Sequence, residues 1–369
     1  MISWLYGKIT DFRNQIYDSG RFKSFSLGAK TVSVGNLTVG GTGKTPLVAF
    51  IAEILAERGE KVCILTRGYG RENSKKRVLV SDGETILADV KQAGDEPFEL
   101  AAKLSGKAIV IADANRVSAA RWAREIFGVT AFVLDDAFQH RRAKRDLDIV
   151  LLDATNPFGN YKILPAGVLR ESLKNLERAD LIVISRANLV ENPADLKTKI
   201  REYNADCPIF ISENKISNLI EIGEFNAKAQ RRKGAKQEIE LQINTDEDRL
   251  KFDKRESGIW NLESETNRAF AFCALGNPNN FFEQLRRENF NLISTETFPD
   301  HHFYTQKDIE KIEKKSRKNG AEMLLTTAKD GVKLKDLQFD MSCLVVETEL
   351  SFDDEKSFRE IIRNVTQRS

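Results

Sequence analysis

The sequence lacks closely spaced cysteines, an excess of charge of one sign and long hydrophobic runs, and each absence argues against a class of protein. Its four cysteines lie far apart with no C-x-x-C pair, at Cys63, Cys207, Cys273 and Cys343. Neither a disulfide framework nor a zinc site is predicted from that spacing, and a reducing compartment is expected. No sign of charge is in excess either, because 57 basic residues face 55 acidic ones. Nothing in the overall charge therefore indicates a nucleic-acid partner.

Long hydrophobic runs are also missing. No run approaches the ~20 residues that a helix needs to cross a bilayer. The start of the chain lacks the apolar region and the small-residue cleavage site of a signal peptide. We therefore expect a protein that stays in the cytoplasm or on the cytoplasmic face of a membrane. At ~100–200 residues per domain, the 369 residues predict two domains.

The order of apolar runs predicts an α/β fold. Short runs such as "KVCILTRG", "AIVIA", "AFVLDD" and "DIVLLDA" end in polar residues and alternate with helical stretches such as "RVSAARWAREIFG". This alternation is typical of a parallel sheet covered on both faces. We expect one domain over residues 31–178 and a second α/β domain over residues 179–369. Within the second, residues 213–262 are charged and poor in large apolar side chains, which indicates a polar insertion or linker.

Residues 1–30 predict an amphipathic helix. Leu5, Ile9, Phe12 and Ile16 are spaced 4, 3 and 4 apart, which places them on one helix face. Five basic residues and two acidic ones give this segment a net charge of +3. A basic helix of this kind can lie in a membrane interface. The same pattern also fits an ordinary helix that packs its apolar face on the core.

The strongest local motif is "VSVGNLTVGGTGKTPLV", residues 32–48. It resembles the phosphate-binding loop G-x-x-x-x-G-K-[ST], although Thr38 stands where the first glycine is expected. A predicted strand precedes it and a predicted helix follows. The predicted nucleotide-binding residues are Gly40, Gly41, Thr42, Gly43, Lys44 and Thr45. In this interpretation the Lys44 ammonium reaches the β- and γ-phosphates and the Thr45 hydroxyl binds Mg²⁺. The alternative is a glycine-rich turn without a ligand.

Acidic residues at two further turns fit the same chemistry. Asp135 and Asp136 end the strand "AFVLDD", where a phosphate-loop enzyme places the carboxylate that holds Mg²⁺. An N-cap pair at a strand–helix turn is the alternative. Asp95 and Glu96 lie in "AGDEPFEL", a turn that starts a predicted helix. Taken alone, that turn favours simple N-capping by Asp95.

The histidines are few and lie in motif-like turns. His140 follows the aspartate pair in "DDAFQH", and His301 and His302 lie together in "FPDHHFY". Each is close to aspartate and aromatic residues, so a functional role and a surface role are both open.

Eight strings, in order, resemble the tetraacyldisaccharide 4'-kinase family of lipid A biosynthesis. They are "SVGNLTVGGTGKTP", "LTRGYGR", "AGDEP", "LDDAFQHRR", "LPAGVLRE", "LGNPNNFF", "FPDHHFY" and "TTAKDGVK". The resemblance extends from the N-terminal helix to about residue 349. It implies transfer of the γ-phosphate of ATP to the 4'-hydroxyl of a tetraacyl glucosamine disaccharide 1-phosphate, at the cytoplasmic face of the inner membrane.

The resemblance also implies a fold and a division of roles. Two α/β/α domains of the phosphate-loop type are expected, joined by a two-stranded β linker. Asp95 and His301 are expected to form the dyad that takes the proton of the sugar hydroxyl, with Lys44 as the third catalytic residue. Glu96 is expected to join Thr45, Asp135 and Asp136 around Mg²⁺.

The remaining expectations concern partners. Asn36, Arg170 and His302 are predicted to contact the substrate. ATP and Mg²⁺ are the expected cofactors, and the protein is expected to be a peripheral, monomeric membrane enzyme that binds no nucleic acid. A second hypothesis from another class is a regulatory or assembly ATPase that acts on a protein partner.

Overall fold

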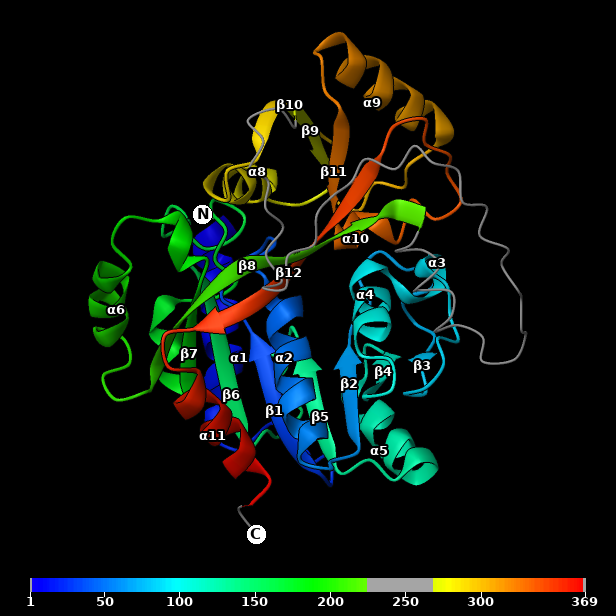
Figure 1. The fold of residues 1–369 in the computed structure, drawn as a ribbon. Coiled ribbons are helices and arrows are strands. Elements are labelled where there is room, and N and C mark those ends of the chain that lie inside the picture. The colour runs from blue at the N-terminus through cyan, green and yellow to red at the C-terminus, as the bar shows by residue number, and fades with distance from the viewer. Residues whose placement is uncertain (1, 224–267, 368–369) are drawn as a thin grey trace. The chain divides into compact units, whose positions relative to one another are not determined.

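The computed structural model describes residues 2–223 and 268–367, which belong to two compact units (Figure 1). Unit 1 comprises Met1–Lys215 and Leu350–Ser369, and unit 2 comprises Ile216–Glu349. The chain passes between them within β8 (Ile209–Glu221) and β12 (Cys343–Phe352), which are neighbouring strands. This division differs from the boundary expected at residue 178, because the strand that follows that boundary pairs with the sheet of unit 1.

The described residues of unit 1 form eight strands and the helices around them. Its strands besides β8 are β1 (Lys30–Gly35), β2 (Val62–Thr66), β3 (Val78–Ser81), β4 (Ala108–Ala112), β5 (Ala131–Asp135), β6 (Leu147–Asp153) and β7 (Leu181–Ser185). Its helices are α1 (Ile2–Asp18), α2 (Lys44–Glu57), α3 (Val90–Ala93), α4 (Asp95–Lys103), α5 (Arg116–Phe127), α6 (Ala194–Arg201) and α11 (Glu355–Val365). Two short 3₁₀ helices, η1 (Leu173–Arg178) and η2 (Ala187–Leu189), flank β7.

The sheet of unit 1 has the order β8-β7-β6-β1-β5-β2-β4-β3. Its recorded pairings are parallel except for β3 against β4, so the sheet is mixed and largely parallel. β1 lies between β5 and β6, and Val34 near its end is opposite Asp135. The register therefore brings the end of the aspartate strand beside the start of the glycine-rich loop.

Helices cover both faces of this sheet, which explains why its strands are continuous apolar runs. Cys63 and Leu65 of β2 pack with the alanines of α5 on one face. On the other face α2 contacts β1, β2 and β5, and its Ile51 and Ile54 are buried. The predicted α/β class is confirmed.

Unit 2 has a smaller parallel sheet of order β10-β9-β11-β12. Its other elements are β9 (Arg268–Cys273), α8 (Pro278–Arg287), β10 (Asn291–Thr297), α9 (Gln306–Lys318), β11 (Met323–Thr327) and α10 (Ala328–Gly331). Phe281, Phe282 and Leu285 of α8 pack on alternate residues of β9 and β11. Part of the polar insertion expected at residues 213–262 is strand, since β8 continues to Glu221. Residues 224–262 of that insertion lie outside the described residues.

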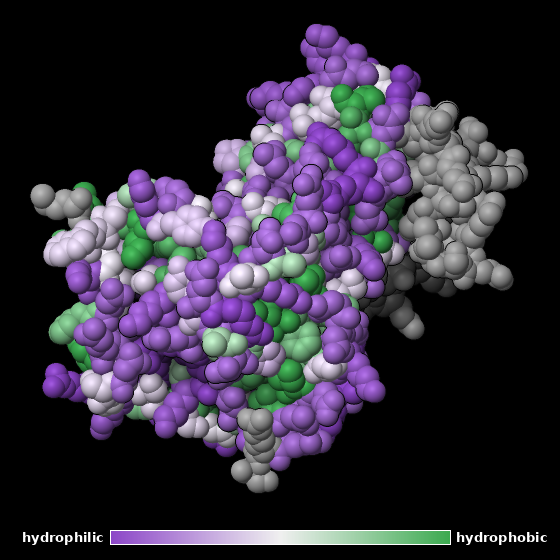
Figure 2. Space-filling view, turned by 90° about the vertical axis from the view of Figure 1, so that its left-hand side faces the viewer, coloured by the Kyte–Doolittle hydropathy of each residue, from purple (hydrophilic) through white to green (hydrophobic). Residues whose placement is uncertain are grey.

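Helix α1 is docked by its polar side and exposes its apolar one. Ile2, Trp4, Leu5, Ile9 and Phe12 are 54–71% exposed, whereas its buried residues are Gly7 and Asn14. This is not the arrangement of an ordinary helix that packs its apolar face on the core. Among the described helices none is long and apolar enough to cross a membrane. Figure 2 shows one face of the molecule, on which hydrophobic residues form limited patches within a mostly hydrophilic surface.

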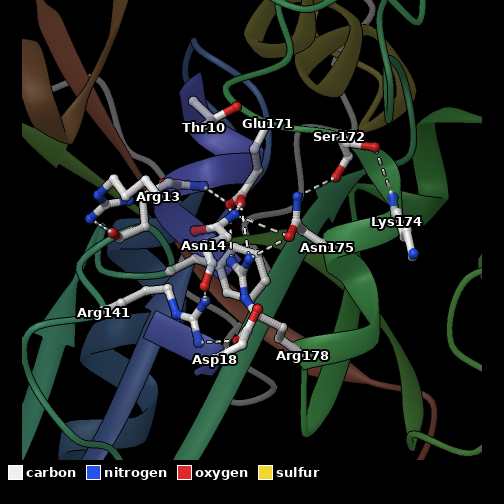
Figure 3. A network of polar contacts seen from close by, with 12 residues as sticks. Thr10, Arg13, Asn14, Asp18, Arg141, Glu171, Ser172, Lys174, Asn175 and Arg178 are labelled. Carbon is white, nitrogen blue, oxygen red and sulfur yellow. Dashed lines mark hydrogen bonds and ion pairs between the residues drawn. The ribbon is translucent and has the colours of Figure 1, made fainter. Parts of the chain in front are cut away.

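A buried polar network fixes α1 to unit 1 (Figure 3). The Asn14 side-chain amide donates to Glu171 at 2.9 Å and to Asn175 at 3.1 Å. Arg178 donates to both oxygens of the Glu171 carboxylate, at 3.0 and 3.1 Å. Arg141 adds a bond to the Asn14 carbonyl at 2.9 Å. Because Asn14 and Glu171 are both buried, undocking of the helix would take a hydrogen-bond donor from a buried carboxylate, which opposes undocking.

Candidate active site

The glycine-rich loop connects β1 directly to α2, as a phosphate-binding loop does. Gly40 has φ +114° and Gly43, the N-cap of α2, has φ +81°. Side-chain-bearing residues rarely adopt these conformations, so glycine is needed at both places. No side chain caps the first turn of α2. Its free backbone N–H groups and positive helix end are suited to an anionic ligand.

Asn36 holds the loop in shape from inside. Its fully buried side-chain amide donates to the Thr38 carbonyl at 2.8 Å and to the Thr42 hydroxyl at 3.1 Å. The Lys44 ammonium donates to the Asn36 side-chain oxygen at 3.3 Å. Thr38 itself forms a bridge with Leu169. The residue at the deviating first position of the motif is therefore part of an internally braced loop, and the substrate contact expected of Asn36 stays a prediction.

The end of β7 supports the loop from the neighbouring side. The Ser185 hydroxyl donates to the Thr42 carbonyl at 3.2 Å. Arg186 donates to the Gly41 carbonyl at 2.9 Å and also pairs with Asp153 at the end of β6. Sequence reasoning missed both residues. The available signal was their place at the end of the strand "DLIVIS", where Ser185 is the last residue and Arg186 follows it, because parallel strands end at the same edge of a sheet.

Asp136 follows β5 and is held by two cations. Lys44 lies 3.3 Å from its Oδ1 and Arg170 lies 2.8 Å from its Oδ2. Burial alone would raise the pKa of Asp136, but the charges of Lys44 and Arg170 outweigh burial and keep the pKa below its usual value. Asp136 also has φ +48°, in the left-handed region that aspartate adopts more often than most residues with a side chain. The structure thus brings two predicted site residues, Lys44 and Arg170, to the carboxylate of a third, Asp136.

Asp135 is the buried partner of the pair and behaves differently. Burial, reinforced by the negative charges of Glu96 and Asp136, raises its pKa to about 6. Lys44 and the Thr66 hydroxyl, which donates to Asp135 at 2.9 Å, oppose that rise without cancelling it. Two adjacent carboxylates with pKa values shifted in opposite directions are a common sign of a functional site.

The acidic residues at this edge fit a cation that is shared with phosphate oxygens. Thr45 is half-buried in the first turn of α2, and its role as a metal ligand stays a prediction. Within the described part of the chain no three His, Cys, Asp or Glu side chains form a group that could hold a metal alone. Mg²⁺ commonly binds through one or two carboxylates and takes its other ligands from the substrate phosphates and water. Such a cation would stabilise the ionised carboxylate of Asp135 and lower its raised pKa.

Asp95 is the first residue of α4 and is buried. The N-cap of α4 is Gly94 and no side chain caps the helix, so the capping role considered for Asp95 is not what the structure shows. Gly94 has φ +90°, and a Cβ there would lie 2.5 Å from the Tyr69 carbonyl. The turn that carries Asp95 is therefore packed directly on the loop of "LTRGYGR", and only glycine fits between them.

His301 and His302 lie in the turn after β10, in unit 2. The His302 ring stacks on Phe298 with centroids 4.8 Å apart, and its Nε2 lies 3.3 Å from Asp308. Asp300 accepts the backbone N–H of His301 at 3.0 Å. The predicted dyad of Asp95 with His301 joins residues of two units and stays a prediction, as does the substrate contact of His302. His140, the third histidine, is half-buried, and the loss of solvation together with nearby arginine charges lowers its pKa to about 4.

Gln139 is a further residue that sequence reasoning missed. Its side-chain amide donates to the Asn36 carbonyl and to Glu171, both at 2.9 Å. Its backbone carbonyl accepts a bond from Arg13 of α1 at 2.8 Å. The network of Figure 3 therefore continues from α1 to the loop. Its presence in the motif "DDAFQH" was the only available signal.

Comparisons with known proteins agree with this geometry. The family profile described as tetraacyldisaccharide-1-P 4'-kinase matches residues 1–367. A tetraacyldisaccharide 4'-kinase of Pelobacter propionicus is 35% identical over 99% of this chain and 91% of its own length. One from Chlorobaculum parvum is 36% identical over 90% and 82%. The crystal structure of LpxK from Aquifex aeolicus in complex with ATP matches with a TM-score of 0.70, at 28% identity, over 99% of this chain and 97% of that one.

Proposed function

Because the chain belongs to the tetraacyldisaccharide-1-P 4'-kinase family and is a tetraacyldisaccharide 4'-kinase of lipid A biosynthesis, we propose that its glycine-rich loop binds ATP and directs the γ-phosphate to the 4'-hydroxyl of the acylated disaccharide 1-phosphate. The related Aquifex aeolicus structure contains ATP. The alternative of a regulatory or assembly ATPase has no observation in its favour, since the family match spans residues 1–367.

The single observation that carries this proposal is that two cations form ion pairs with Asp136. Lys44 and Arg170 are fixed beside the start of α2 by a carboxylate they share. A phosphate group that enters the loop meets Lys44 already desolvated and oriented. Phosphoryl transfer depends mainly on positioning and on neutralising charge at the transferred group. Lys44 and Arg170 supply the positive charge, and the N–H groups of Gly41 to Lys44 supply the hydrogen bonds.

Mg²⁺ is proposed to bind between Thr45 and the carboxylates that end β5. When bound, it supplies charge to the β- and γ-phosphate oxygens. Asp135 is the residue most suited to it, because burial and the charges of Glu96 and Asp136 raise its pKa and a cation would reverse this. Glu96 lies close enough to act on Asp135 electrostatically and is proposed as a water-mediated ligand.

The general base is proposed to be Asp95, oriented by His301. Asp95 is buried at the start of α4 and is not used as a helix cap. Its carboxylate takes the proton of the 4'-hydroxyl as the oxygen attacks phosphorus, and ADP leaves. A sugar hydroxyl needs such a base within hydrogen-bond reach. Since the two residues come from different units, the dyad would couple proton transfer to enclosure of the substrate.

The exposed apolar side of α1 supports a peripheral place at the inner membrane. Trp4, Leu5 and Phe12 lie on the side that faces away from unit 1, and basic residues flank them. Such a helix buries its apolar face in the headgroup region, where an acylated substrate resides. β8 and β12 are proposed to be the two-stranded linker between the units, and the enzyme is proposed to act as a monomer.

Steady-state kinetics of Asp95→Asn test the assignment of the base. We expect kcat to fall by about 10²–10⁴-fold with little change in ATP affinity, because a general base contributes that much and does not hold the nucleotide. Asp89→Asn is the matched control, since Asp89 is the N-cap of α3, the short helix that comes just before Asp95. If Asp95→Asn weakens ATP binding and keeps kcat, Asp95 is a nucleotide-site residue and the assignment fails.

A further inference from the structure

The motif "TTAKDGVK", residues 326–333, has no role in the reaction described so far. It covers the end of β11 and the whole of α10. Within it Asp330 and Lys333 form an ion pair at 2.9 Å, and neither side chain has any exposed surface. Apolar residues of similar size would often stabilise a core equally well, so a fully buried ion pair calls for another explanation than stability.

Asp330 ties two strand ends together. Its Oδ2 accepts the Ala274 N–H just after β9 at 3.0 Å and the Thr327 hydroxyl at the end of β11 at 2.8 Å. Its other oxygen faces Lys333, whose ammonium lies 5.7 Å from the centre of the Tyr304 ring. Burial and the Asp330 charge raise the pKa of Tyr304. Helix α10 is thereby fixed beneath the turn that contains His301.

The turn itself is held on both sides of His301. Tyr304 packs edge-on against Phe298 and His302, with centroids 5.1 and 5.2 Å apart. The Phe298 N–H donates to the Cys273 carbonyl at 2.9 Å. Between these anchors His301 has φ +63°, in the left-handed region that is uncommon for residues with a side chain.

Lys329 makes the direct link between α10 and this turn. Its ammonium lies 3.0 Å from Asp300 Oδ1, and its side chain is 14% exposed. The same Asp300 oxygen accepts the His301 N–H at 3.0 Å, and Asp300 Oδ2 lies 3.7 Å from His301 Nε2. The carboxylate that Lys329 holds therefore bonds to the His301 backbone and lies beside its ring.

We propose that Lys329 is a positioning residue for His301: it orients the Asp300 carboxylate, which sets the His301 backbone and ring, while the buried Asp330–Lys333 pair anchors Lys329 on the strand ends. This proposal deepens the proposed role of His301 in proton transfer and rests on it. Lys329 touches neither reacting atom in this scheme, and it acts through Asp300.

The test is a double-mutant cycle on the full-length enzyme. Lys329→Met should lower kcat about tenfold or more, because misplacing a reacting group by ~1 Å costs on the order of 10²-fold. KM for ATP and the melting temperature should stay unchanged. Lys329→Arg should restore much of kcat. Lys335→Met, which changes an exposed lysine two residues after the motif, is the control and should match the wild type.

The Lys329→Met substitution in a His301→Ala background distinguishes the role of Lys329 from the role of His301. There, Lys329→Met should cause no further loss, because its effect passes through the imidazole. Two outcomes would overturn the positioning role of Lys329 without affecting the proposed role of His301. One is a kcat in the double variant that is lowered by the product of the two single losses, and the other is a full kcat in Lys329→Met alone. A full kcat in His301→Ala would instead overturn the proposed role of His301, on which this inference depends.

Discussion

The side-chain amide of Asn14 donates to the Glu171 carboxylate at 2.9 Å, so a residue of the first helix is bonded to the neighbour of Arg170. Glu171 also accepts from Gln139, which donates to the carbonyl of Asn36. Through three side chains, the docking of α1 reaches the start of the glycine-rich loop.

Removing the Asn14 amide should loosen α1. Asn14→Ala takes one donor from a buried carboxylate, which costs about 1–3 kcal/mol of stability. Denaturant unfolding should show that loss, and limited proteolysis should cleave within residues 2–18 faster than in the wild type. Gln15→Ala, exposed on the same helix, is the control. Equal stability and equal protection for the two variants would contradict the docking role of Asn14.

The apolar side of α1 should carry membrane binding. Replacing Leu5 and Phe12 by serine removes two exposed apolar side chains. At about 1.5–3 kcal/mol for each side chain when fully buried, binding to vesicles of anionic phospholipid should weaken tenfold or more. Ile126→Ser, which changes an exposed apolar residue of α5, should leave binding unchanged. Co-sedimentation measures both, and a similar loss in both variants would point to general surface hydrophobicity.

Lys44 should be indispensable for transfer. Lys44→Ala removes a desolvated cation from the phosphate site, and loss of one such preorganised group typically lowers kcat by about 10²–10³-fold. Of the two cations that pair with Asp136, Arg170 is the one that this substitution leaves in place. Lys107→Ala breaks an exposed ion pair with Glu53 of the same helix and should keep kcat. Near-normal turnover of ATP and lipid by Lys44→Ala would refute the loop assignment.

The raised pKa of Asp135 predicts how stability depends on pH. A carboxyl whose pKa is raised on folding from 3.8 to about 6 binds more protons in the folded state, so its contribution becomes more unfavourable as pH rises through this range. Asp135→Asn should therefore stabilise the metal-free protein by about 3 kcal/mol at pH 8 and by roughly half of that at pH 5.

Unfolding in urea with a chelator present, at several pH values from 5 to 8, measures this difference. A stabilisation that does not change with pH would show that Asp135 titrates normally. Added Mg²⁺ and ATP should remove the advantage of Asp135→Asn, because a bound cation favours the ionised carboxylate.

Several features of the site follow from local sequence. The loop from Gly40 to Thr45 was predictable, because glycine, lysine and threonine at this spacing leave few other uses for a strand–helix turn. Asp135 and Asp136 were predictable as the end of a buried strand. The braces from β7 were not, since Ser185 and Arg186 reach the loop only when β1, β6 and β7 pair.

By itself, the sequence determined the α/β class, the phosphate-binding loop and the resemblance to a lipid kinase family, because these depend on residue type, order and spacing along the chain. Only the tertiary structure decided which side of α1 is exposed and that Asp135 and Asp136 shift their pKa values in opposite directions. Those properties depend on burial and on the distances to charges such as Lys44, Glu96 and Arg170. Residues far apart in the chain set these distances, and no local pattern records them.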